Sequence, residues 1–460
     1  MGSEWRYVAF REICDHSAFG PRFSSDEYAI DGNVACLRTM DIDNNGTIDF
    51  EAMPIARLDL SRLTSHILRR DDLVMTRTGA YLGKVAVFSD FRLPVLPGAF
   101  SIRFRLDQSA ALPLFVRYFF NGPEGQRAIQ SVATGSAQPN INITNLHSLE
   151  IPLPPLSHQR AIAHILGSLD DKIELNRRMN ETLEGMAQEL FKSWFVDFDP
   201  VIDNALVAGN PIPEELADRA EVRRAALANG TANREAAKPF PAAFKHTEEL
   251  GWIPVGWESK TLNDLGEVNR GRSRHRPRHA AHLYGGPHPF VQTGDIKAAK
   301  GRITSYTQTY SEAGLHQSRL WPAGTMCITI AANIAETAVL TFPACFPDSV
   351  IGFIPDEEKC KVYVAEYNFR ILKERLQREA TGSVQDNINL ETISRTYFVM
   401  PPIKPQNEFY KVFNPVNERI IRNERESLTL SALRDTLLPK LISGELRIPD
   451  AEKLAEAALA

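Results

Sequence analysis

Five arginines occupy alternate residues of one short segment and form the strongest local concentration of positive charge in the chain: Arg270, Arg272, Arg274, Arg276 and Arg278. In extended backbone, alternate side chains project from the same side, so these guanidinium groups could contact a row of phosphates or guanine edges. Charge runs are usually solvated, disordered loops, and that alternative remains open. Because the run contains no acidic residue to pair with the arginines, we favour nucleic-acid binding.

A polar motif that occurs twice, at residues 135–142 and 382–389, is the second candidate. Both copies contain Gly-Ser, then Gln, then Asn-Ile-Asn. Gln and Asn amides can pair with adenine or bind phosphate, although the same residues are common in ordinary turns. The repetition favours a functional role. The candidate contacts are Ser136, Gln138, Asn140, Ser383, Gln385 and Asn387.

Two short segments of the first half also have the composition of DNA-contact loops: residues 20–22 and 77–81. Arg, Thr and Tyr side chains commonly contact phosphates and bases, but plain turns explain these segments equally well. The candidates are Arg22, Arg77, Thr78 and Tyr81, together with Thr293 from the second half.

Pro347-Asp348, followed by Glu357-Glu358-Lys359, matches the PD-x8-ExK pattern of metal-dependent nucleases. In such a site, Asp and Glu bind a divalent ion and Lys lies beside the scissile phosphate. Short motifs also match by chance, and this triplet falls in a charged turn after Pro355. A nuclease site formed by Asp348, Glu357 and Lys359 is therefore the minor alternative.

Other catalytic motifs are absent from the sequence. It contains no P-loop for ATP, no Gly-rich strand-to-helix turn for a methyl-donor nucleotide, no Asn/Asp-Pro-Pro-aromatic motif and no His/Cys zinc cluster. Five cysteines without a CxxC pair are typical of reduced thiols in a cytoplasmic protein. No apolar run has the length of a membrane span, and no signal peptide is expected. The net charge of −5 allows local basic patches but argues against a non-specific nucleic-acid coat.

Two long helices are predicted to position the candidate residues. From Pro154 to Asp197, apolar residues follow the 4-3 spacing of a heptad seam, and the same stripe returns 247 residues later. Asn176 aligns with Asn423, and polar seam residues of this kind set the register of paired helices. The seam positions are Leu166, Ile173, Asn176, Leu183, Leu190 and Trp194 in the first helix, and Phe413, Ile420, Asn423, Leu430 and Leu437 in the second.

The repeat extends beyond the helices and indicates an internal duplication of roughly 200 residues or more. Gln159 aligns with Gln406, and both helices follow a Pro-Pro pair. Short strands precede each helix; in Phe100–Leu106 the apolar and polar residues separate onto opposite faces. Pro415 is predicted to break or kink the second helix. Residues 199–255, with a charged helix at Glu214–Ala228, form an insert that has no counterpart in the second half.

A duplicated α/β unit, each copy followed by this polar loop, a Pro-Pro turn and a heptad helix, resembles the specificity subunit of type I restriction–modification enzymes. The resemblance covers essentially the whole chain. It is closest at residues 189–200 (ELFKSWFVDFDP), 249–257 and 433–441. Pro415 and the Ala-rich insert at 214–237 depart from the family pattern.

The resemblance implies an α+β fold in which two pseudo-symmetric α/β target recognition domains are joined by two long helices that form an antiparallel coiled coil. The implied domains are target recognition domain 1 (1–152), a central conserved helix (153–199), a connector (200–255), target recognition domain 2 (256–400), a C-terminal conserved helix (401–447) and a tail (448–460).

The resemblance also implies a non-catalytic DNA-binding subunit whose two domains recognise the halves of a bipartite, asymmetric site in double-stranded DNA. The helices would recruit two methyltransferase subunits and, through them, restriction/translocase subunits. S-adenosylmethionine, ATP and Mg²⁺ are expected on those partners; this chain is expected to hold no metal or cofactor and to bind no membrane.

Two other hypotheses remain beside this one. A stand-alone nuclease would cut plasmid DNA with magnesium and without partners or ATP. A coiled-coil scaffold without a DNA role would leave DNA affinity unchanged when Arg272 and Arg274 are replaced.

Overall fold

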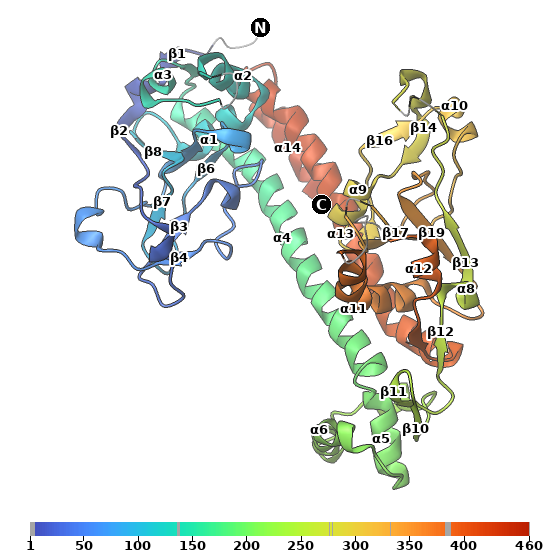
Figure 1. Cartoon of the computed structure of the whole chain (residues 1–460). Coiled ribbons are helices and arrows are strands. Elements are labelled where there is room, and N and C mark those ends of the chain that lie inside the picture. Colours follow the sequence, from blue (N-terminus) through green and yellow to red (C-terminus); the bar gives the residue numbers. More distant parts are fainter. Residues whose placement is uncertain are drawn as a thin grey trace. The chain divides into compact units, whose positions relative to one another are not determined.

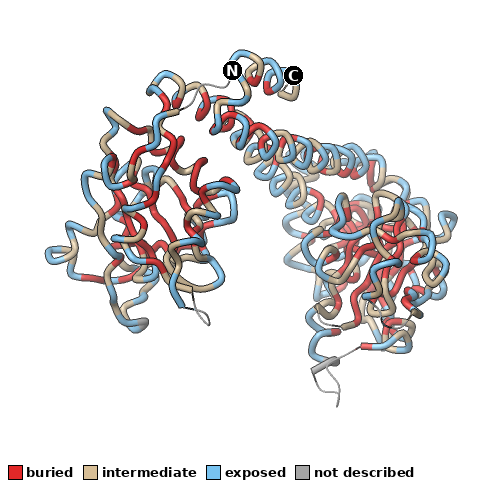
Figure 2. Tube along the Cα trace, turned by 90° about the horizontal axis from the view of Figure 1, so that it is seen from above, coloured by how far each residue is buried: buried red, intermediate tan, exposed pale blue. Residues whose placement is uncertain are grey.

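The computed structural model of the 460-residue chain describes residues 5–135, 139–275, 277, 279–331, 333–381 and 388–459. Two compact units emerge, Met1–Leu175 with Glu426–Ala460 (unit 1) and Asn176–Arg425 (unit 2). Figure 1 shows their elements, and Figure 2 shows that each unit has its own buried interior. Within these described ranges, no helix is long and apolar enough to cross a membrane.

A four-stranded antiparallel sheet forms the centre of unit 1, with strand order β2-β8-β5-β6. One face packs on α1 through Phe115 and Phe119, and the other packs on a smaller sheet, β4-β3-β7. β1 pairs with β9. The bounds are β1 Tyr7–Ala9, β2 Cys14–Phe19, β3 Val34–Leu37, β4 Ile55–Ala56, β5 Leu73–Thr76, β6 Val85–Val87, β7 Val95–Pro97, β8 Ser101–Leu106, β9 Glu150–Pro152, α1 Pro113–Asn121, α2 Pro123–Val132 and α3 Ile143–His147.

The polar side of β8 is buried, which the alternation of residue types did not indicate. Arg103 is 1% exposed; it donates to the Ser65 carbonyl at 2.7 Å and lies 2.7 Å from Nδ1 of His16. Arg105 pairs with buried Asp72 at 2.8 Å. The second sheet and the segment before β5 cover this face, so its charges are paired rather than solvated.

Unit 2 has the same central arrangement with an additional strand, in the order β13-β19-β17-β18-β15. α11 packs on one face through Ala365 and Phe369, and Trp321 and Phe346 pack on the other. β12 pairs with β20, and β14 with β16. The bounds are β12 Glu258–Lys260, β13 Gly266–Arg270, β14 Tyr284–Phe290, β15 Arg302–Ile303, β16 Gln308–Tyr310, β17 Met326–Thr329, β18 Thr337–Leu340, β19 Val350–Pro355, β20 Phe398–Met400, α8 Leu262–Leu265, α9 Thr293–Ala298, α10 Glu312–His316, α11 Val362–Thr381 and α12 Leu390–Ser394.

Two fully buried glutamines, Gln159 and Gln406, show the repeat at atomic detail. Each side-chain amide donates to two backbone carbonyls and accepts a hydrogen bond from one backbone N–H. These three bonds join the start of a long helix to the segment before α1 in unit 1, or before α11 in unit 2. The partners are Pro154, Ala110 and Leu112 in unit 1, and Pro401, Lys359 and Lys361 in unit 2, at 2.8 to 3.0 Å. The prediction of two pseudo-symmetric α/β domains is confirmed.

The two long helices, α4 (Leu156–Phe195) and α13 (Ile403–Ile442), have 40 residues each and pair antiparallel. In unit 1 the start of α4 packs on the end of α13, and in unit 2 the end of α4 packs on the start of α13. The shared buried residues are Leu166, Leu169, Leu430 and Leu437 in unit 1, and Phe191, Trp194, Phe409 and Phe413 in unit 2. Of the other predicted seam positions, Ile420 is buried and Ile173, Leu183 and Leu190 are half-buried.

Amide side chains interrupt the apolar seam within unit 2. Asn176 Nδ2 donates to the Asn423 carbonyl at 3.4 Å, and Asn423 Nδ2 donates to Asn180 Oδ1 at 2.8 Å. Asn180 Nδ2 in turn donates to the Ile420 carbonyl at 3.2 Å. Because Asn176 and Asn423 are almost fully buried, a slipped register would leave their amides without partners, so these bonds favour one alignment of the helices.

α13 continues through Pro415, so a break there is wrong, whereas a kink stays a prediction. A proline inside a helix loses one backbone hydrogen bond and clashes with the preceding turn, at a cost of ~3 kcal/mol. Its neighbours Phe413 and Val416 pack in the unit 2 core, and Phe413 is fully buried. Burial of such side chains contributes about 1.5–3 kcal/mol each, which offsets that cost.

The connector is folded and is partly a repeat. α6 matches the predicted charged helix but begins at Ala217, and Arg219 and Arg223 bind buried Asp199 and Asp203 of α5. A short helix follows each long helix: α5 follows α4, and α14 follows α13. Both short helices have proline as their second residue, Pro200 in α5 and Pro449 in α14. The segment predicted as a tail is thus a helix packed in unit 1, and α5 has a counterpart. The bounds are α5 Asp199–Ala208, α6 Ala217–Ala228, α7 Arg234–Ala237, β10 Phe244–Thr247, β11 Gly251–Pro254 and α14 Ile448–Leu459.

His147, the last residue of α3, is expected to make unit 1 less stable in acid. Its ring packs beside Phe10 and Phe104, and its buried Nε2 has no hydrogen-bond partner among the described residues. Burial, with Arg11 nearby, lowers the pKa of His147. The folded state therefore disfavours the protonated ring, and stability should fall as the pH drops below ~6.5, by at most about 1.4 kcal/mol per pH unit. Urea unfolding at pH 8, 6 and 5 measures this loss.

His147→Phe should reduce that pH dependence, whereas His164→Gln, a change at an exposed position of α4, should leave it intact. Equal pH dependence in the wild type and His147→Phe would contradict the assignment.

Candidate nucleic-acid interface

One edge of the central sheet in unit 1 gathers the predicted residues of the first half. Strands β2 and β5 end at this edge and β8 begins there, because β8 is antiparallel to both: Phe19 lies opposite Ile102, and Thr76 opposite Ser101. We call residues 19–22, 76–81, 100 and 140 the unit 1 contact edge.

Arg77 and Asn140 are far apart in sequence but touch at this edge. Arg77 Nε donates to Asn140 Oδ1 at 3.2 Å, and the Ile141 N–H donates to the Arg77 carbonyl at 3.0 Å. Asn140 also forms backbone bridges with Thr78 and Thr134. The base of the first polar loop is therefore bonded to the turn between β5 and β6; its residues Ser136 and Gln138 lie outside the described residues.

The rest of the unit 1 contact edge is basic and aromatic. Arg22 is exposed, and Tyr81, 39% exposed, has Lys84 Nζ 4.3 Å from its ring centroid. Burial lowers the pKa of Lys84, which also donates to the Ile42 carbonyl at 3.0 Å. Phe19 and Phe100 are 39% and 60% exposed. Phe19 and Lys84 were not predicted from the sequence. Phe100 was predicted on the apolar face of β8, although it precedes the strand and is exposed.

The arginine segment lies at the equivalent edge of unit 2. β13 ends at Arg270 and β17 ends at Thr329, both beside the start of β19. Arg270, Arg272 and Arg274 are exposed, whereas the intervening Gly271 and Ser273 are buried. Alternate exposure is what a row of DNA contacts requires. Arg276 and Arg278 lie outside the described residues.

Backbone hydrogen bonds hold this arginine segment on the domain. Gly271 N–H donates to the Val350 carbonyl at 2.8 Å, and Ser318 Oγ donates to the Arg272 carbonyl at 2.9 Å. The His275 N–H donates to Gln317 Oε1 at 2.9 Å. The described part of the segment is therefore fixed in place, with Arg272 and Arg274 exposed and the Arg270 Nε bonded to the Asp348 carbonyl.

A glycine follows the last residue of the strand in both candidate segments: Gly20 after β2 and Gly271 after β13. A Cβ at Gly20 would lie 2.0 Å from the Gly98 carbonyl oxygen, and one at Gly271 would lie 2.2 Å from that of Pro347. Only glycine permits so close an approach of two backbones. The chain therefore leaves the two sheets at equivalent points, Gly20 and Gly271.

The second half of the repeated polar motif has a structural role. Asn142 and Asn389 are the N-caps of α3 and α12, and their Oδ1 atoms accept the N–H groups of Asn145 at 2.7 Å and Thr392 at 2.8 Å. Helix capping therefore accounts for the final Asn in both copies of the motif, and no DNA contact is needed to explain it. Ser383, Gln385 and Asn387 lie outside the described residues. Thr293 begins α9 and is half-buried; no hydrogen bond in the described ranges joins it to the arginine segment.

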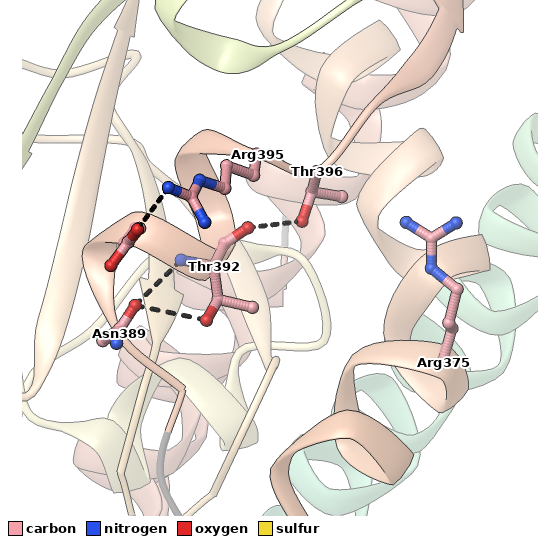
Figure 3. Close-up of a pocket in the computed structure, with 6 residues that line it drawn as sticks. Arg375, Asn389, Thr392, Arg395 and Thr396 are labelled. Carbon is pink, nitrogen blue, oxygen red and sulfur yellow. Dashed lines mark hydrogen bonds and ion pairs between the residues drawn. The ribbon is translucent and has the colours of Figure 1, made fainter.

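A shallow pocket lies beside α12 in unit 2 (Figure 3). It is lined by Arg375, Asn389, Glu391, Thr392, Arg395 and Thr396. Most of its polar groups serve the local fold: Thr392 Oγ1 bonds Asn389, Thr396 Oγ1 donates to the Thr392 carbonyl, and Arg395 pairs with Glu391. Arg375 extends toward the pocket from α11, which gives it a basic wall but no catalytic group.

The nuclease pattern does not form a site. Asp348 precedes β19, whereas Glu357 and Lys359 follow it, and this six-residue strand is ~20 Å long. Lys359 pairs with Asp356 at 2.9 Å and Glu357 pairs with Lys361 at 2.6 Å. Across the described ranges, no group of three His, Cys, Asp or Glu side chains could hold a metal ion. The nuclease alternative is therefore excluded on geometry.

A buried charge network that the sequence did not reveal holds the second α/β domain on the helices of unit 2. Glu184 of α4 accepts hydrogen bonds from Arg302 at 2.6 Å and from Arg370. Burial alone would raise the pKa of Glu184, but the two guanidinium groups hold it below its usual value. Arg302 also donates to Asn417 at 2.5 Å, so four elements meet at these charges: α4, α11, α13 and β15.

The sequence matches the family model of the type I restriction modification DNA specificity domain at residues 2–185 and 254–430. The chain belongs to this family. The specificity subunit of the type I restriction enzyme HindI from Haemophilus influenzae is 27% identical over 96% of this chain and 100% of the relative. That of MjaIX from Methanocaldococcus jannaschii is 25% identical over 73% of this chain and 69% of the relative.

A solved type I S subunit from M. genitalium has the same fold, with a TM-score of 0.57 and 15% identity over 95% of this chain and 96% of the other. The predicted fold class and family are confirmed. This is a type I specificity subunit, whose task is DNA sequence recognition, and it is not an enzyme.

Proposed function

We propose that the chain recognises a bipartite, asymmetric site in double-stranded DNA, with one α/β domain on each half-site. The equivalent contact edges of the two units support this best. Arg22 and the Arg77–Asn140 pair form one edge, and the arginine segment forms the other. Two domains of one fold with unlike contact residues suit two unlike half-sites. The recognition domains would comprise residues 1–152 and 256–400, the boundaries predicted from sequence.

We further propose that α4 and α13 recruit two methyltransferase subunits and, through them, the restriction/translocase subunits. Apolar side chains remain exposed on both helices although their shared seam is filled: Leu175 and Leu428 in unit 1, and Met186 and Val412 in unit 2, each 44–59% exposed. Exposed apolar groups of this kind suit a further protein partner.

The cofactors of the complex are proposed to bind its other subunits. S-adenosylmethionine would serve methyl transfer, and ATP with Mg²⁺ would serve translocation and cleavage, so this chain would contribute recognition alone. We place the complex in the cytoplasm, where its five cysteines, all free, would stay reduced.

Mapping methylated adenines tests the proposed function. The chain would be co-expressed with type I methyltransferase subunits in cells that lack other modification, and methylated positions would be located by sequencing. A single bipartite motif with a fixed gap is expected. Scattered methylation, or one continuous motif, would contradict the proposal.

Arg272→Ala combined with Arg274→Ala should weaken binding to all DNA sequences and make its salt dependence shallower. If each arginine contacts one phosphate, the slope of log K against log salt should decrease by about 1.8 in total. Fluorescence anisotropy of labelled duplex DNA at several salt concentrations measures this. Arg224→Ala with Lys238→Ala removes the same charge from the connector and should leave the slope unchanged. An unchanged slope in the double arginine variant would instead favour the scaffold hypothesis.

A further inference from the structure

The guanidinium group of Arg77 is held on two sides at the unit 1 contact edge. Its Cζ lies over the Phe19 ring, 4.6 Å from the ring centroid. Its Nε donates to Asn140 Oδ1 at 3.2 Å. The Arg77 backbone is fixed as well, because its N–H donates to the Phe100 carbonyl at 2.9 Å. Backbone and side chain are therefore both oriented before any ligand binds.

These contacts leave one functional edge of Arg77 available. Among the described residues, neither terminal nitrogen of Arg77 has a hydrogen-bond partner. A guanidinium whose Nε is occupied still presents Nη1 and Nη2 as a fork. O6 and N7 of guanine are two acceptors at the spacing of such a fork, and they lie together in the major groove. Because Arg77 is already held, little of its conformational freedom is lost on binding.

The surroundings of Arg77 favour a base edge over a phosphate. Phe19, which lies under the Arg77 guanidinium, and Phe100, whose carbonyl accepts the Arg77 N–H, both expose aromatic surface. Such surface suits the apolar groups of a groove floor better than the hydrated backbone. Phosphate contact fits Arg22, which is exposed on the same edge.

Unit 2 has no equivalent arginine. β5 ends at Thr76 opposite Ser101, and β17 ends at Thr329 opposite Val350, so Ile330 occupies the place of Arg77. Ile330 is 2% exposed and belongs to the core. Among the described residues, this position therefore holds an arginine in the first domain and a buried isoleucine in the second.

We propose that Arg77 recognises a guanine in the half-site bound by unit 1, and that Asn140 and Phe19 are its positioning residues. This assignment rests on the proposed DNA-recognition function. To that function the assignment adds one recognised base, a guanine. It also names the residue that contacts this guanine and the half-site in which the guanine lies.

The first test uses the wild-type protein, assembled with its methyltransferase subunits, on DNA that carries the mapped motif. Each guanine of the motif is replaced in turn by 7-deazaguanine, which lacks the N7 acceptor but keeps Watson–Crick pairing. One guanine, in one half-site, should be sensitive, with affinity about 5- to 150-fold lower. If no guanine is sensitive, or if the motif contains none in that half-site, the assignment is wrong. If the wild type methylates no defined motif, the proposed function itself fails.

The second test assigns the sensitive guanine to Arg77. Arg77→Met removes every donor of the fork and keeps a long side chain, so it should accept other bases at that position and lose no affinity on replacement of guanine by 7-deazaguanine. Asn140→Ala should relax the same base pair, and the double variant should lose little more than Arg77→Met, because both changes disable one contact. Arg22→Ala, which also removes one charge, should lower affinity for all sequences and keep the motif. If Arg77→Met retains the wild-type motif, or if the 7-deazaguanine effect persists in it, the assignment is overturned.

Discussion

Arg302→Met should lower the free energy of unfolding of unit 2 by about 3–5 kcal/mol, the usual effect of breaking a buried ion pair from one side. Arg302 is 2% exposed and binds Glu184 at 2.6 Å. Without it, Glu184 keeps only Arg370 as a cationic partner, and Asn417 loses its donor. Urea unfolding followed by tryptophan fluorescence measures the change, because Trp194, Trp252, Trp257 and Trp321 all belong to unit 2.

A matched control separates burial from loss of charge. Arg395 and its partner Glu391 are 77% and 62% exposed, so Arg395→Met should change stability by no more than about 1 kcal/mol. In a second variant, Glu184→Leu added to Arg302→Met should recover part of the loss, because it removes the carboxylate left short of cations. A loss below about 1 kcal/mol for Arg302→Met would show that these charges are solvated rather than buried.

The helix pairing could be predicted because it depends on spacing within the sequence. A 4-3 repeat of apolar residues defines a stripe on a helix whatever surrounds it, and the two stripes were sufficient to predict the pair α4 and α13. The continuity of α13 at Pro415 could not be predicted in the same way. It depends on the packing of Phe413 and Val416 in a core assembled from distant parts of the chain.

The candidate site was predictable to a similar extent. Alternation along an extended segment was enough to expect Arg270, Arg272 and Arg274 on one side, and all three are exposed, with buried residues between them. The contact of Arg77 with Asn140 depends on sheet order and register, which no local pattern contains. The burial of Arg103 has the same origin, since a second sheet covers a strand face that is polar in sequence.

Replacing residues 256–400 with the corresponding domain of another specificity subunit should change one half of the recognised motif and leave the other half and the gap unchanged. The arginine segment would be exchanged, whereas the unit 1 contact edge and both long helices would be kept. The graft must still fit the helices. The donor should therefore supply, or be given, the residues that contact Glu184: Arg302, Tyr367 and Arg370. Adenine methylation mapping measures the motif of the chimera.

The reciprocal graft of residues 1–152 is the matched control for this exchange. It should change the opposite half-site, and with it the guanine assigned to Arg77, while the base pairs contacted by the second domain stay the same. A chimera with both half-sites altered would show that recognition is shared between the domains. A chimera that methylates the parental motif would place recognition outside residues 256–400. Because each domain is attached to the helices by its own buried contacts, through Gln159 in unit 1 and Gln406 in unit 2, independent exchange is the expected outcome.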